Sequence, residues 1–241
     1  MSTNISIIIP AYNESDNIEI LLKKIRENIR SHIIIIDDSN NNLTKSVLKK
    51  KKIKVTYIKR NKKMGRGSAV LEGLKRALKS NKIEIFIEMD ADLSHSPSEL
   101  RRNIKFFKDK NLDLLVSSKY LNKSQIVNWP ISRRILSRLA NHLVKFLLKI
   151  PCSDFTNGYR IYSRRAAKKI VEKCGKIGDG FIILSEIILV LHKNNFNLSE
   201  IKSKFVNRSR GESSVNLKLI VASLIGLIKL FFTRNSTYYQ N

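Results

Sequence analysis

Two carboxylates that stand two residues apart, Asp90 and Asp92, are the side chains of this sequence best suited to chemistry. They follow the apolar run 83–89, which is typical of a buried strand in a parallel sheet. Because side chains alternate along an extended chain, residues two apart point the same way. Paired carboxylate oxygens suit Mg2+ or Mn2+ carried by a substrate phosphate, since these ions keep several waters and need few protein ligands. The alternative is an ordinary loop of solvated acids, and the motif alone leaves both open.

Apolar periodicity predicts the elements that must position this pair. Mainly apolar strands are expected at 5–9, 33–36, 55–58, 83–89 and 112–117, with helical segments between them. Strands that alternate with helices form βαβ units, so we predict an α/β fold with a mostly parallel, doubly wound sheet. Ser96-Pro97-Ser98-Glu99 has the spacing of a capping box and predicts a helix start directly after the acidic pair. Asp16 with Glu19 predicts a capped helix after the first strand.

Polar clusters follow three of these predicted strands, namely Asn13-Glu14, Asp37-Asp38 and Asp90-x-Asp92. The carboxyl ends of parallel strands meet at the edge where open α/β sheets bind ligands, so we expect the clusters to share one site. Gly65-Arg66-Gly67 opens the helix before the fourth strand. Its backbone N–H groups could cradle a phosphate, or the glycines could serve a tight turn.

A polar stripe marks a predicted helix in the second half of the chain. Trp129, Arg133, Ser137 and Asn141 recur every four residues within the segment 129–150, so they lie close to one helix face. Such a stripe needs polar partners if it faces inward. Polar loops are expected at 154–160 and 208–213, and the mainly apolar helix 181–192 carries one acid, Glu186.

The charge balance favours an anionic partner. The 241 residues include 46 Lys and Arg against 20 Asp and Glu, which gives a formal net charge of +26. Charge alone would also suit a nucleic-acid-binding protein, but the basic runs lack interleaved aromatic residues for base stacking. Cys152 and Cys174 show no metal-ligand spacing and fit a reducing compartment. The first apolar run has no basic flank, so we predict a strand there and not a signal peptide.

The end of the chain predicts an amphipathic helix over 215–232. Apolar residues recur there at helical spacing, with Lys218 and Lys229 near the ends. This helix could close the core or lie among lipid headgroups, and we expect partial membrane burial. No apolar run reaches the ~20 residues that span a bilayer. We therefore predict one main domain at 1–214, followed by an amphipathic helix and tail at 215–241.

Taken in order, these motifs resemble those of the family-2 glycosyltransferases, and within them the dolichyl-phosphate (polyprenyl-phosphate) mannosyltransferase group, in its short form without transmembrane helices. The resemblance runs from Ile5 to about Phe232 and implies a GT-A-like, Rossmann-like catalytic domain at 1–214. The motifs that carry it are Ile9-Pro10-Ala11-Tyr12-Asn13-Glu14, Asp37-Asp38, Gly65-Arg66-Gly67-Ser68-Ala69, Asp90-Ala91-Asp92-Leu93-Ser94-His95-Ser96-Pro97, Ser118-Lys119-Tyr120, the Trp129/Arg133/Ser137/Asn141 stripe, Thr156-Asn157-Gly158-Tyr159-Arg160 and Arg208-x-x-Gly211-Glu212-Ser213.

The resemblance also implies roles for single residues. Catalytic roles would fall to Asp92, Arg133 and Arg208. The nucleotide sugar would be bound by Pro10, Tyr12, Glu14, Asp37, Asp38, Gly67, Asp90 and Lys119. The acceptor phosphate would be bound by Arg133, Ser137, Arg160 and Arg208. The metal ion, Mg2+ or Mn2+, would be held by Asp90, Asp92 and Ser94.

Several positions depart from the family pattern. Lys119 stands where relatives usually have arginine, and lysine keeps the charge but loses the guanidinium fork. Ser94 stands where relatives often place glutamine, and Ser214 where they commonly have lysine. Asn40 and Asn42 also differ from the usual Ser and Asp of the second loop. An inactive relative that serves as a binding subunit therefore stays open.

The implied activity is inverting, metal-dependent transfer of a hexosyl group, mannose from GDP-mannose, to a polyprenyl or dolichyl phosphate. No catalytic base is required, because a phosphate monoester has its second pKa at about 6 and arrives mostly ionised. The alternative is transfer from UDP-glucose or UDP-N-acetylglucosamine to a lipid phosphate or a glycan hydroxyl. Expected partners are the nucleotide sugar, the polyprenyl phosphate, an anionic membrane surface and, as an option, a membrane-anchoring partner subunit, but no nucleic acid. We expect a cytoplasmic protein, peripheral on the cytoplasmic face of a membrane.

Overall fold

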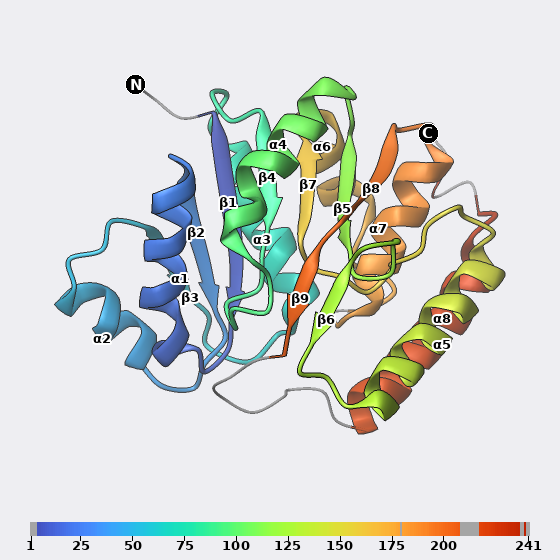
Figure 1. Cartoon of the computed structure of the whole chain (residues 1–241), viewed down its shortest axis with the longest axis horizontal. Helices are drawn as coiled ribbons and strands as arrows, with labels where there is room; N and C mark the ends of the chain where they lie inside the picture. The colour runs from blue at the N-terminus through green and yellow to red at the C-terminus, as the bar shows by residue number, and fades with distance from the viewer. Residues whose placement is uncertain (1–3, 179, 208–216, 237–238, 240–241) are drawn as a thin grey trace.

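The structure, a computed structural model, describes residues 4–178, 180–207, 217–236 and 239 (Figure 1). A large β-sheet flanked by helices forms its centre, and a pair of short strands lies beside it. The large sheet contains, in spatial order, β3 (Thr56–Lys59), β2 (His32–Asp37), β1 (Ile5–Ala11), β4 (Ile85–Glu88), β7 (Arg160–Ser163), β5 (Leu114–Ser118) and β8 (Leu198–Lys202). The short pair is β6 (Gln125–Val127) with β9 (Lys204–Val206).

The prediction of a mostly parallel α/β sheet is confirmed. Neighbouring strands of the large sheet run parallel except at β7, which pairs antiparallel with both β4 and β5. Each strand predicted from an apolar run lies within the sheet. Neither β7 nor β8 was predicted, because both interrupt their apolar residues with polar ones and the period-two signal over so few residues is weak.

Helices connect the strands and cover the sheet. In chain order they are α1 (Ser15–Asn28), α2 (Leu43–Lys50), α3 (Arg66–Leu78), the 3-10 helix η1 (Pro97–Glu99), α4 (Leu100–Asp109), α5 (Ile131–Leu148), α6 (Arg164–Lys173), α7 (Ile182–Lys193) and α8 (Leu217–Thr233). Helices begin after both acidic loops as predicted, at Ser15 and at Pro97 with Ser96 as N-cap residue, but neither predicted capping box forms its hydrogen bonds. The N-cap of α1 is Glu14, so Asp16 already lies in the first turn. Ser96 makes no capping bond, and Glu99 instead accepts hydrogen bonds from the Ser203 hydroxyl at 2.6 Å and the Lys204 backbone N–H at 3.1 Å.

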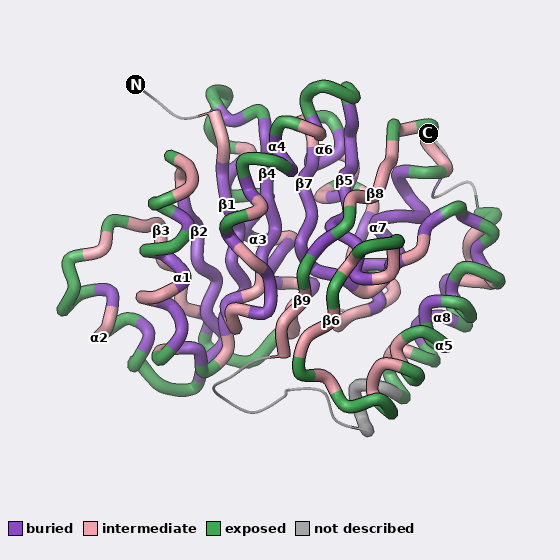
Figure 2. Tube along the Cα trace, in the orientation of Figure 1, coloured by how far each residue is buried: buried purple, intermediate pink, exposed green. Residues whose placement is uncertain are grey.

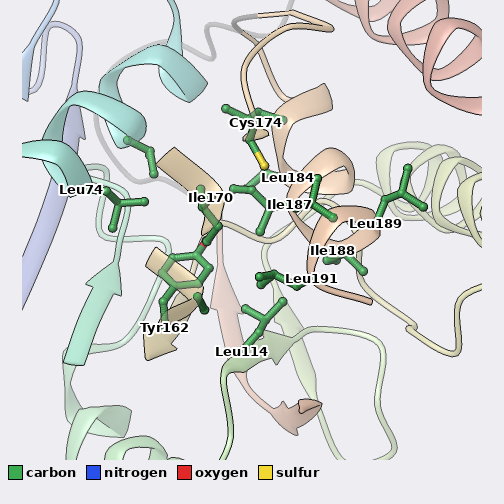
Figure 3. Close-up of a cluster of buried hydrophobic side chains, with 14 of the residues drawn as sticks. Leu74, Leu114, Tyr162, Ile170, Cys174, Leu184, Ile187, Ile188, Leu189 and Leu191 are labelled. Carbon is green, nitrogen blue, oxygen red and sulfur yellow. The ribbon is translucent and has the colours of Figure 1, made fainter. Parts of the chain in front are cut away.

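The sheet buries an apolar cluster on each face. Strand side chains alternate between the two, so Ile8 enters one cluster while Ile7 and Ile9 enter the other. One face is covered by α3, α6 and α7, whose residues meet around Tyr162 and Leu114 (Figure 3). The other face is covered by α1 and α4. Helix α7 is apolar nearly all round because neighbouring elements bury the whole stretch 182–191.

Helices α5 and α8 lie side by side at one end of the molecule (Figure 1). Val144 and Leu148 of α5 and Leu227 and Leu230 of α8 are buried on the side toward the core. Much of the outer side of both helices is exposed (Figure 2). Among the residues that the structure describes, no helix is both long and apolar enough to cross a bilayer.

Candidate active site

The three predicted polar clusters lie at one edge of the sheet. β2, β1 and β4 are parallel neighbours, with Ala11 in register with Asp37 and Ile8 with Glu88. The loops that follow these strands therefore leave the sheet together at its lower edge in Figure 1. The three clusters thus lie at the edge where such sheets bind ligands, and that they form one binding site stays a prediction.

The loop after β1 is tied to the loop after β2. Asn13 has a left-handed backbone, with φ of 57°, and its N–H donates to Ser39 Oγ at 2.8 Å. Glu14 is mostly buried and accepts a hydrogen bond from Asn17 Nδ2 at 2.6 Å. This bond within the first turn of α1 therefore orients the Glu14 carboxylate, which was predicted to bind the nucleotide sugar.

Pro10 and Tyr12 differ in their access to solvent. Pro10 is buried within β1, whereas Tyr12 is partly exposed in the loop that follows. The Lys63 ammonium lies 3.8 Å from the centre of the Tyr12 ring, a cation–π contact. Of these two predicted donor-binding residues, Tyr12 thus presents an aromatic surface with a positive charge beside it.

Asp37, predicted to bind the nucleotide sugar, is completely buried. Its carboxylate accepts hydrogen bonds from the Ser39 backbone N–H at 2.9 Å and from the Tyr57 hydroxyl at 2.7 Å. A buried carboxylate is costly unless it is paired in this way. Asp37 therefore connects β2 with β3 and lies below the surface that a ligand would reach.

Asp38 is engaged at the start of α3. It accepts hydrogen bonds from Arg60 Nη2 at 2.6 Å and from the backbone N–H groups of Met64 and Gly65 at 3.0 and 3.1 Å. Gly65 has a positive φ of 90°, which glycine adopts without strain. The helix start predicted to cradle a phosphate therefore binds the chain's own carboxylate. Gly67, two residues later, is buried inside α3.

Asp90 is bound by Arg66, which was not among the predicted site residues. Arg66 Nε and Nη2 lie 2.8 and 2.7 Å from Asp90 Oδ1. The remaining nitrogen, Nη1, lies 2.6 Å from Oε1 of the fully buried Glu88. The Asp90 side chain is 26% exposed, so it is the accessible end of this network.

Asp92 and Ser94 form a tight turn beyond Asp90. Asp92 Oδ1 accepts the Ser94 backbone N–H at 3.0 Å, and Leu93 between them has a positive φ of 62°. Ser94 is buried. The His95 Nε2 nitrogen is buried without a hydrogen-bond partner in the described structure and lies 3.8 Å from Asp90 Oδ2. Strain and an orphaned nitrogen both occur at the loop that carries the predicted metal ligands.

The donor set of this loop fits a hard divalent ion that arrives with a substrate. Among the described residues, no three or more His, Cys, Asp or Glu side chains converge on a metal-sized site. Mg2+ and Mn2+ do not require such a cage when phosphate oxygens and waters complete the coordination. Asp92 and Asp90 supply hard oxygen atoms, and Asp90 is shared with Arg66.

Lys119, the predicted donor-binding lysine, is buried against an acid. Its Nζ lies 2.9 Å from Asp154 Oδ1 and 3.1 Å from Thr156 Oγ1. Burial alone would raise the pKa of Asp154, but the ion pair with Lys119 and bonds from backbone N–H groups outweigh it and lower that pKa. In this arrangement Lys119 neutralises Asp154 and supports the loop 154–160.

The polar stripe lies on one face of α5, as its spacing predicts, and the structure turns that face toward the body of the protein. Asn141 Oδ1 accepts the Phe155 backbone N–H at 2.7 Å. Ser137 Oγ accepts a hydrogen bond from the Tyr120 hydroxyl at 2.6 Å. Burial raises the pKa of Tyr120 to about 12, so this hydroxyl keeps its proton at neutral pH and remains a donor.

Arg133, at the start of α5, lies over the indole of Trp129 and beside Asn207. Its guanidinium carbon is 4.6 Å from the ring centre, and Nη1 is 3.5 Å from Asn207 Oδ1. Arg208 follows Asn207 directly in the sequence but lies outside the described residues, as do Gly211 to Ser214 of the same predicted loop.

Arg160 does not join the predicted acceptor site. It is fully buried in β7, and it donates to the backbone carbonyls of Asn157, Leu184 and Phe155 at 2.8, 2.7 and 3.0 Å. These bonds fasten the loop 154–160 to α7. A phosphate could contact this guanidinium only after the core around it had opened.

A cavity of about 610 Å3 opens beside Asp92. Its walls come from the second half of α1, the loop 92–98 and the segment 204–207, together with Asn128. Asn207 lines this cavity and also contacts Arg133. Asp92 and Arg133, which are far apart in the sequence, therefore border neighbouring parts of one surface.

Several charged residues of this region were not predicted as site residues, among them Arg60, Arg66, Glu88 and Asp154. Glu88 gave the clearest available signal, because it is an acid inside an otherwise apolar strand and needs a buried partner. Arg66 stands between two glycines at a helix start. No local pattern names their partners, since each pair joins elements that are distant in sequence.

Comparison with known proteins identifies the family. A model described as glycosyl transferase family 2 matches residues 6–171, more than half of the chain. The chain belongs to glycosyl transferase family 2. It is similar to the polyprenol monophosphomannose synthase of Mycolicibacterium smegmatis, with 30% identity over 215 residues, which are 87% of this chain and 80% of that protein. The resemblance drawn from the motifs is confirmed, and the chain is a glycosyltransferase.

A second relative is longer than this family-2 chain. The dolichol-phosphate mannosyltransferase of Pyrococcus furiosus is 31% identical over 238 residues, which are 94% of this chain. The match covers 63% of that protein, so the chain spans less than two thirds of it.

Solved structures confirm the GT-A-like fold of this family-2 chain. The crystal structure of glucosyl-3-phosphoglycerate synthase from Mycobacterium tuberculosis in complex with Mn2+, UDP and glucosyl-3-phosphoglycerate has a TM-score of 0.68 and 16% identity. The match covers 96% of this chain and 79% of that chain. The same synthase with Mn2+ and UDP-glucose also gives a TM-score of 0.68. At this identity the likeness shows the fold alone.

Proposed function

We propose that this family-2 glycosyltransferase moves a mannosyl group from GDP-mannose to a polyprenyl phosphate, with inversion at the anomeric carbon. Relatives named polyprenol monophosphomannose synthase and dolichol-phosphate mannosyltransferase support this reaction. The observation that carries the proposal is α5, which presents both surfaces that a lipid phosphate requires. Arg133 and Ser137 face the body of the protein, while large apolar side chains cover the outer side of the same helix.

The exposed apolar surface extends over two helices, and we call it the α5–α8 face. Its members are Ile131, Ile135, Leu136, Leu139, Leu143 and Phe146 of α5, with Val221, Leu224, Ile225, Ile228 and Phe232 of α8. Phe146 is 78% exposed and Phe232 is 77% exposed. Contiguous apolar surface of this kind marks an interaction site on a soluble domain. We propose that the α5–α8 face rests in the headgroup layer of a membrane, on its cytoplasmic side, and brings a lipid-borne phosphate to Arg133.

Basic side chains around the α5–α8 face favour an anionic leaflet. Arg138 and Lys145 of α5 and Lys229 of α8 are exposed on the same helices. Each such charge near an anionic surface contributes about 1 kcal/mol. Together with the buried apolar area, a few of them hold a protein on a membrane without a spanning helix.

The carboxylates after β4 and the polar residues of α5 would have different roles in this reaction. Asp92, with Asp90, would hold a Mg2+ or Mn2+ ion, which neutralises charge on the donor diphosphate and its leaving group. Arg133 would donate N–H bonds to the acceptor phosphate oxygens, and Ser137, oriented by Tyr120, would add a hydroxyl. The acceptor phosphate is already an anion, so these residues orient an in-line displacement and remove no proton.

A second candidate is the same transfer from a UDP-linked sugar. It is favoured by the UDP and UDP-glucose bound to the glucosyl-3-phosphoglycerate synthase, whose fold is similar. The two candidates differ in the donor nucleotide and share the edge described above.

The test is transfer of radiolabelled sugar into an organic-extractable polyprenyl phosphate product. GDP-mannose, UDP-glucose and UDP-N-acetylglucosamine are compared with Mn2+ and with Mg2+. Asp92→Ala is the test variant, and Asp109→Ala is its matched control, because Asp109 forms an exposed pair with Lys105 at the end of α4. We expect label from GDP-mannose in the lipid phase, lost in Asp92→Ala and retained in Asp109→Ala.

Other results of this assay have definite meanings. Label that reaches the lipid phase only from a UDP sugar would mean that this nucleotide sugar, and not GDP-mannose, is the donor. Label that stays in the aqueous phase with every donor, while the protein is folded, would contradict the lipid-phosphate acceptor. Full activity of Asp92→Ala would contradict the role given to Asp92.

A further inference from the structure

We propose that Arg66 is a positioning residue, which fixes the carboxylate of Asp90 so that it can serve the donor and its metal ion. The inference rests on the proposed function, in which Asp90 belongs to the donor site. It assigns the task to the arginine between the two glycines at the start of α3, and it makes the fully buried Glu88 the anchor of that arginine.

The contact between Arg66 and Asp90 is directional. Arg66 Nε and Nη2 converge on one oxygen, Asp90 Oδ1, at 2.8 and 2.7 Å. A charge-assisted hydrogen bond such as the one from Nε is about twice as strong as a neutral one. Together with the close ion contact from Nη2, it restricts where Asp90 Oδ1 lies.

Glu88 holds the other side of the guanidinium. Its Oε1 lies 2.6 Å from Arg66 Nη1, and its Oε2 accepts the Tyr162 hydroxyl at 2.5 Å. Glu88 lies within β4 and has no exposed surface, so no ligand reaches it in this arrangement. A buried carboxylate without a partner would be costly, and Arg66 supplies that partner. Arg66 thus has a rigid anchor in the sheet and an accessible carboxylate at the edge.

Gly158 leaves the space that this contact requires. A Cβ atom at Gly158 would lie 1.9 Å from Arg66 Nη2 and 3.1 Å from Asp90 Oδ2. Any larger residue would therefore push the guanidinium away from the carboxylate. Gly158 comes from the loop 154–160, so a motif far from Asp90 in the sequence takes part in placing it.

Lysine cannot replace this arginine. An ammonium group keeps the positive charge, but it lacks the planar guanidinium that pairs with Glu88 through Nη1 while its Nε–H donates to Asp90. Arg66→Lys therefore tests positioning apart from charge. Arg165→Lys is the matched control, because Arg165 contacts Asp113 through Nε and Nη2 at the opposite edge of the sheet.

The experiment measures donor binding directly as well as turnover. Calorimetry gives the affinity of the wild type and both variants for GDP with Mn2+, and steady-state rates give KM for the donor and for the acceptor. Outer residues that orient metal ligands typically change metal affinity by about 10–100-fold. We expect Arg66→Lys to weaken Mn2+-dependent GDP binding and raise the donor KM by at least about 10-fold. The acceptor KM, and all values for Arg165→Lys, should stay within about 2-fold of the wild type.

A further variant guards against misfolding. Arg66→Met leaves Glu88 unpaired, but Arg66→Met combined with Glu88→Gln removes the buried charge and keeps an acceptor for Tyr162. This double variant should fold and still bind GDP and Mn2+ weakly. Donor affinity equal to the wild type in the folded double variant, or in Arg66→Lys, overturns the inference.

Failure of the proposed function can be told apart from failure of this inference. A folded wild type that binds neither GDP nor UDP with Mn2+ contradicts the proposed function. Crystal structures of the wild type and Arg66→Lys then decide the inference without a ligand. If the Asp90 carboxylate of Arg66→Lys has moved or shows two conformations, the inference is supported. If it lies where it does in the wild type, the inference is overturned.

Discussion

Asp154 is a buried carboxylate that organises the loop 154–160, beside the sheet edge that carries the candidate active site, which we call the active edge. It has no exposed surface and accepts the backbone N–H groups of Lys119, Thr156 and Asn157 at 3.0, 3.2 and 3.1 Å. The Lys119 ammonium adds an ion pair at 2.9 Å. The lysine at this family position therefore contributes to the fold, whatever it contributes to donor binding.

Lys119→Met should destabilise the protein strongly. Removing one partner of a buried ion pair leaves the other charge uncompensated and costs about 3–5 kcal/mol in free energy of unfolding. Urea unfolding followed by circular dichroism measures this value. Lys105→Met is the control, since its pair with Asp109 is exposed and worth at most about 0.5 kcal/mol. A loss below about 1 kcal/mol for Lys119→Met would mean that Asp154 does not depend on this lysine.

At the scale of elements, helix α5 has a polar side that faces the protein and an apolar side that faces outward. Its polar stripe bonds to the segment 154–157 and to Tyr120, while its apolar outer side continues onto α8. An ordinary surface helix buries its apolar side and exposes its polar side. Helix α5 reverses this arrangement over much of its length. The reversal is the physical reason to expect a nonaqueous phase on its outer side.

Replacing apolar residues of the α5–α8 face should abolish membrane binding and leave stability unchanged. The test is Leu139→Ser with Phe146→Ser, because these side chains are 62% and 78% exposed. We expect the wild type to sediment with vesicles that contain anionic lipid and the double variant to stay in the supernatant. Exposed positions should change the free energy of unfolding by no more than about 0.5 kcal/mol each. Leu43→Ser on α2, at a position 57% exposed, is the control. Equal sedimentation of all three proteins would exclude this face as the membrane contact.

At the scale of the whole molecule, Glu186 joins three distant segments. It lies in the middle of α7, where Gly175 N–H donates to its Oε2 at 2.8 Å and the Tyr239 hydroxyl donates to its Oε1 at 3.2 Å. Burial raises the pKa of this carboxyl above its ordinary value, although these donors partly oppose the shift. The core that supports the active edge therefore contains a carboxyl group that resists ionisation.

Glu186→Gln should stabilise the protein increasingly as the pH rises. Above the unfolded-state pKa of about 4.3, the unfolded chain releases this proton while the folded chain retains it. The folded state then binds more protons, so the free energy of unfolding falls as pH rises toward the folded-state pKa. Glutamine keeps the acceptor oxygen without the charge.

Thermal unfolding at pH 4 and pH 7.5 measures this effect. The melting temperature of Glu186→Gln minus that of the wild type should be near zero at pH 4 and positive at pH 7.5. Glu172→Gln on the exposed side of α6 is the control, because its side chain is 57% exposed. A variant less stable than the wild type at pH 7.5 would show that the ionised Glu186 stabilises the fold.

The sequence by itself determined the framework of this protein. Continuous apolar runs are enough to predict a strand such as 5–9 or 33–36, because burial on both faces is the main source of strand stability there. Parallel order then brings the loops after β1, β2 and β4 to one edge, and a spacing of four places the α5 stripe on one side. These are periodic properties of the chain and need no knowledge of distant contacts. The same motifs also led to the family.

Only the tertiary structure decided which charged groups face the edge and which are buried beneath it. Asp37, Asp38 and Arg160 belong to family motifs, yet each is buried and bound by neighbouring elements. Arg66 and Glu88 belong to the same network as Asp90, and nothing in their local sequence says so. A carboxylate becomes ligand or support according to what packs against it. That packing joins strands, helices and loops from across the chain, so local periodicity carries no record of it.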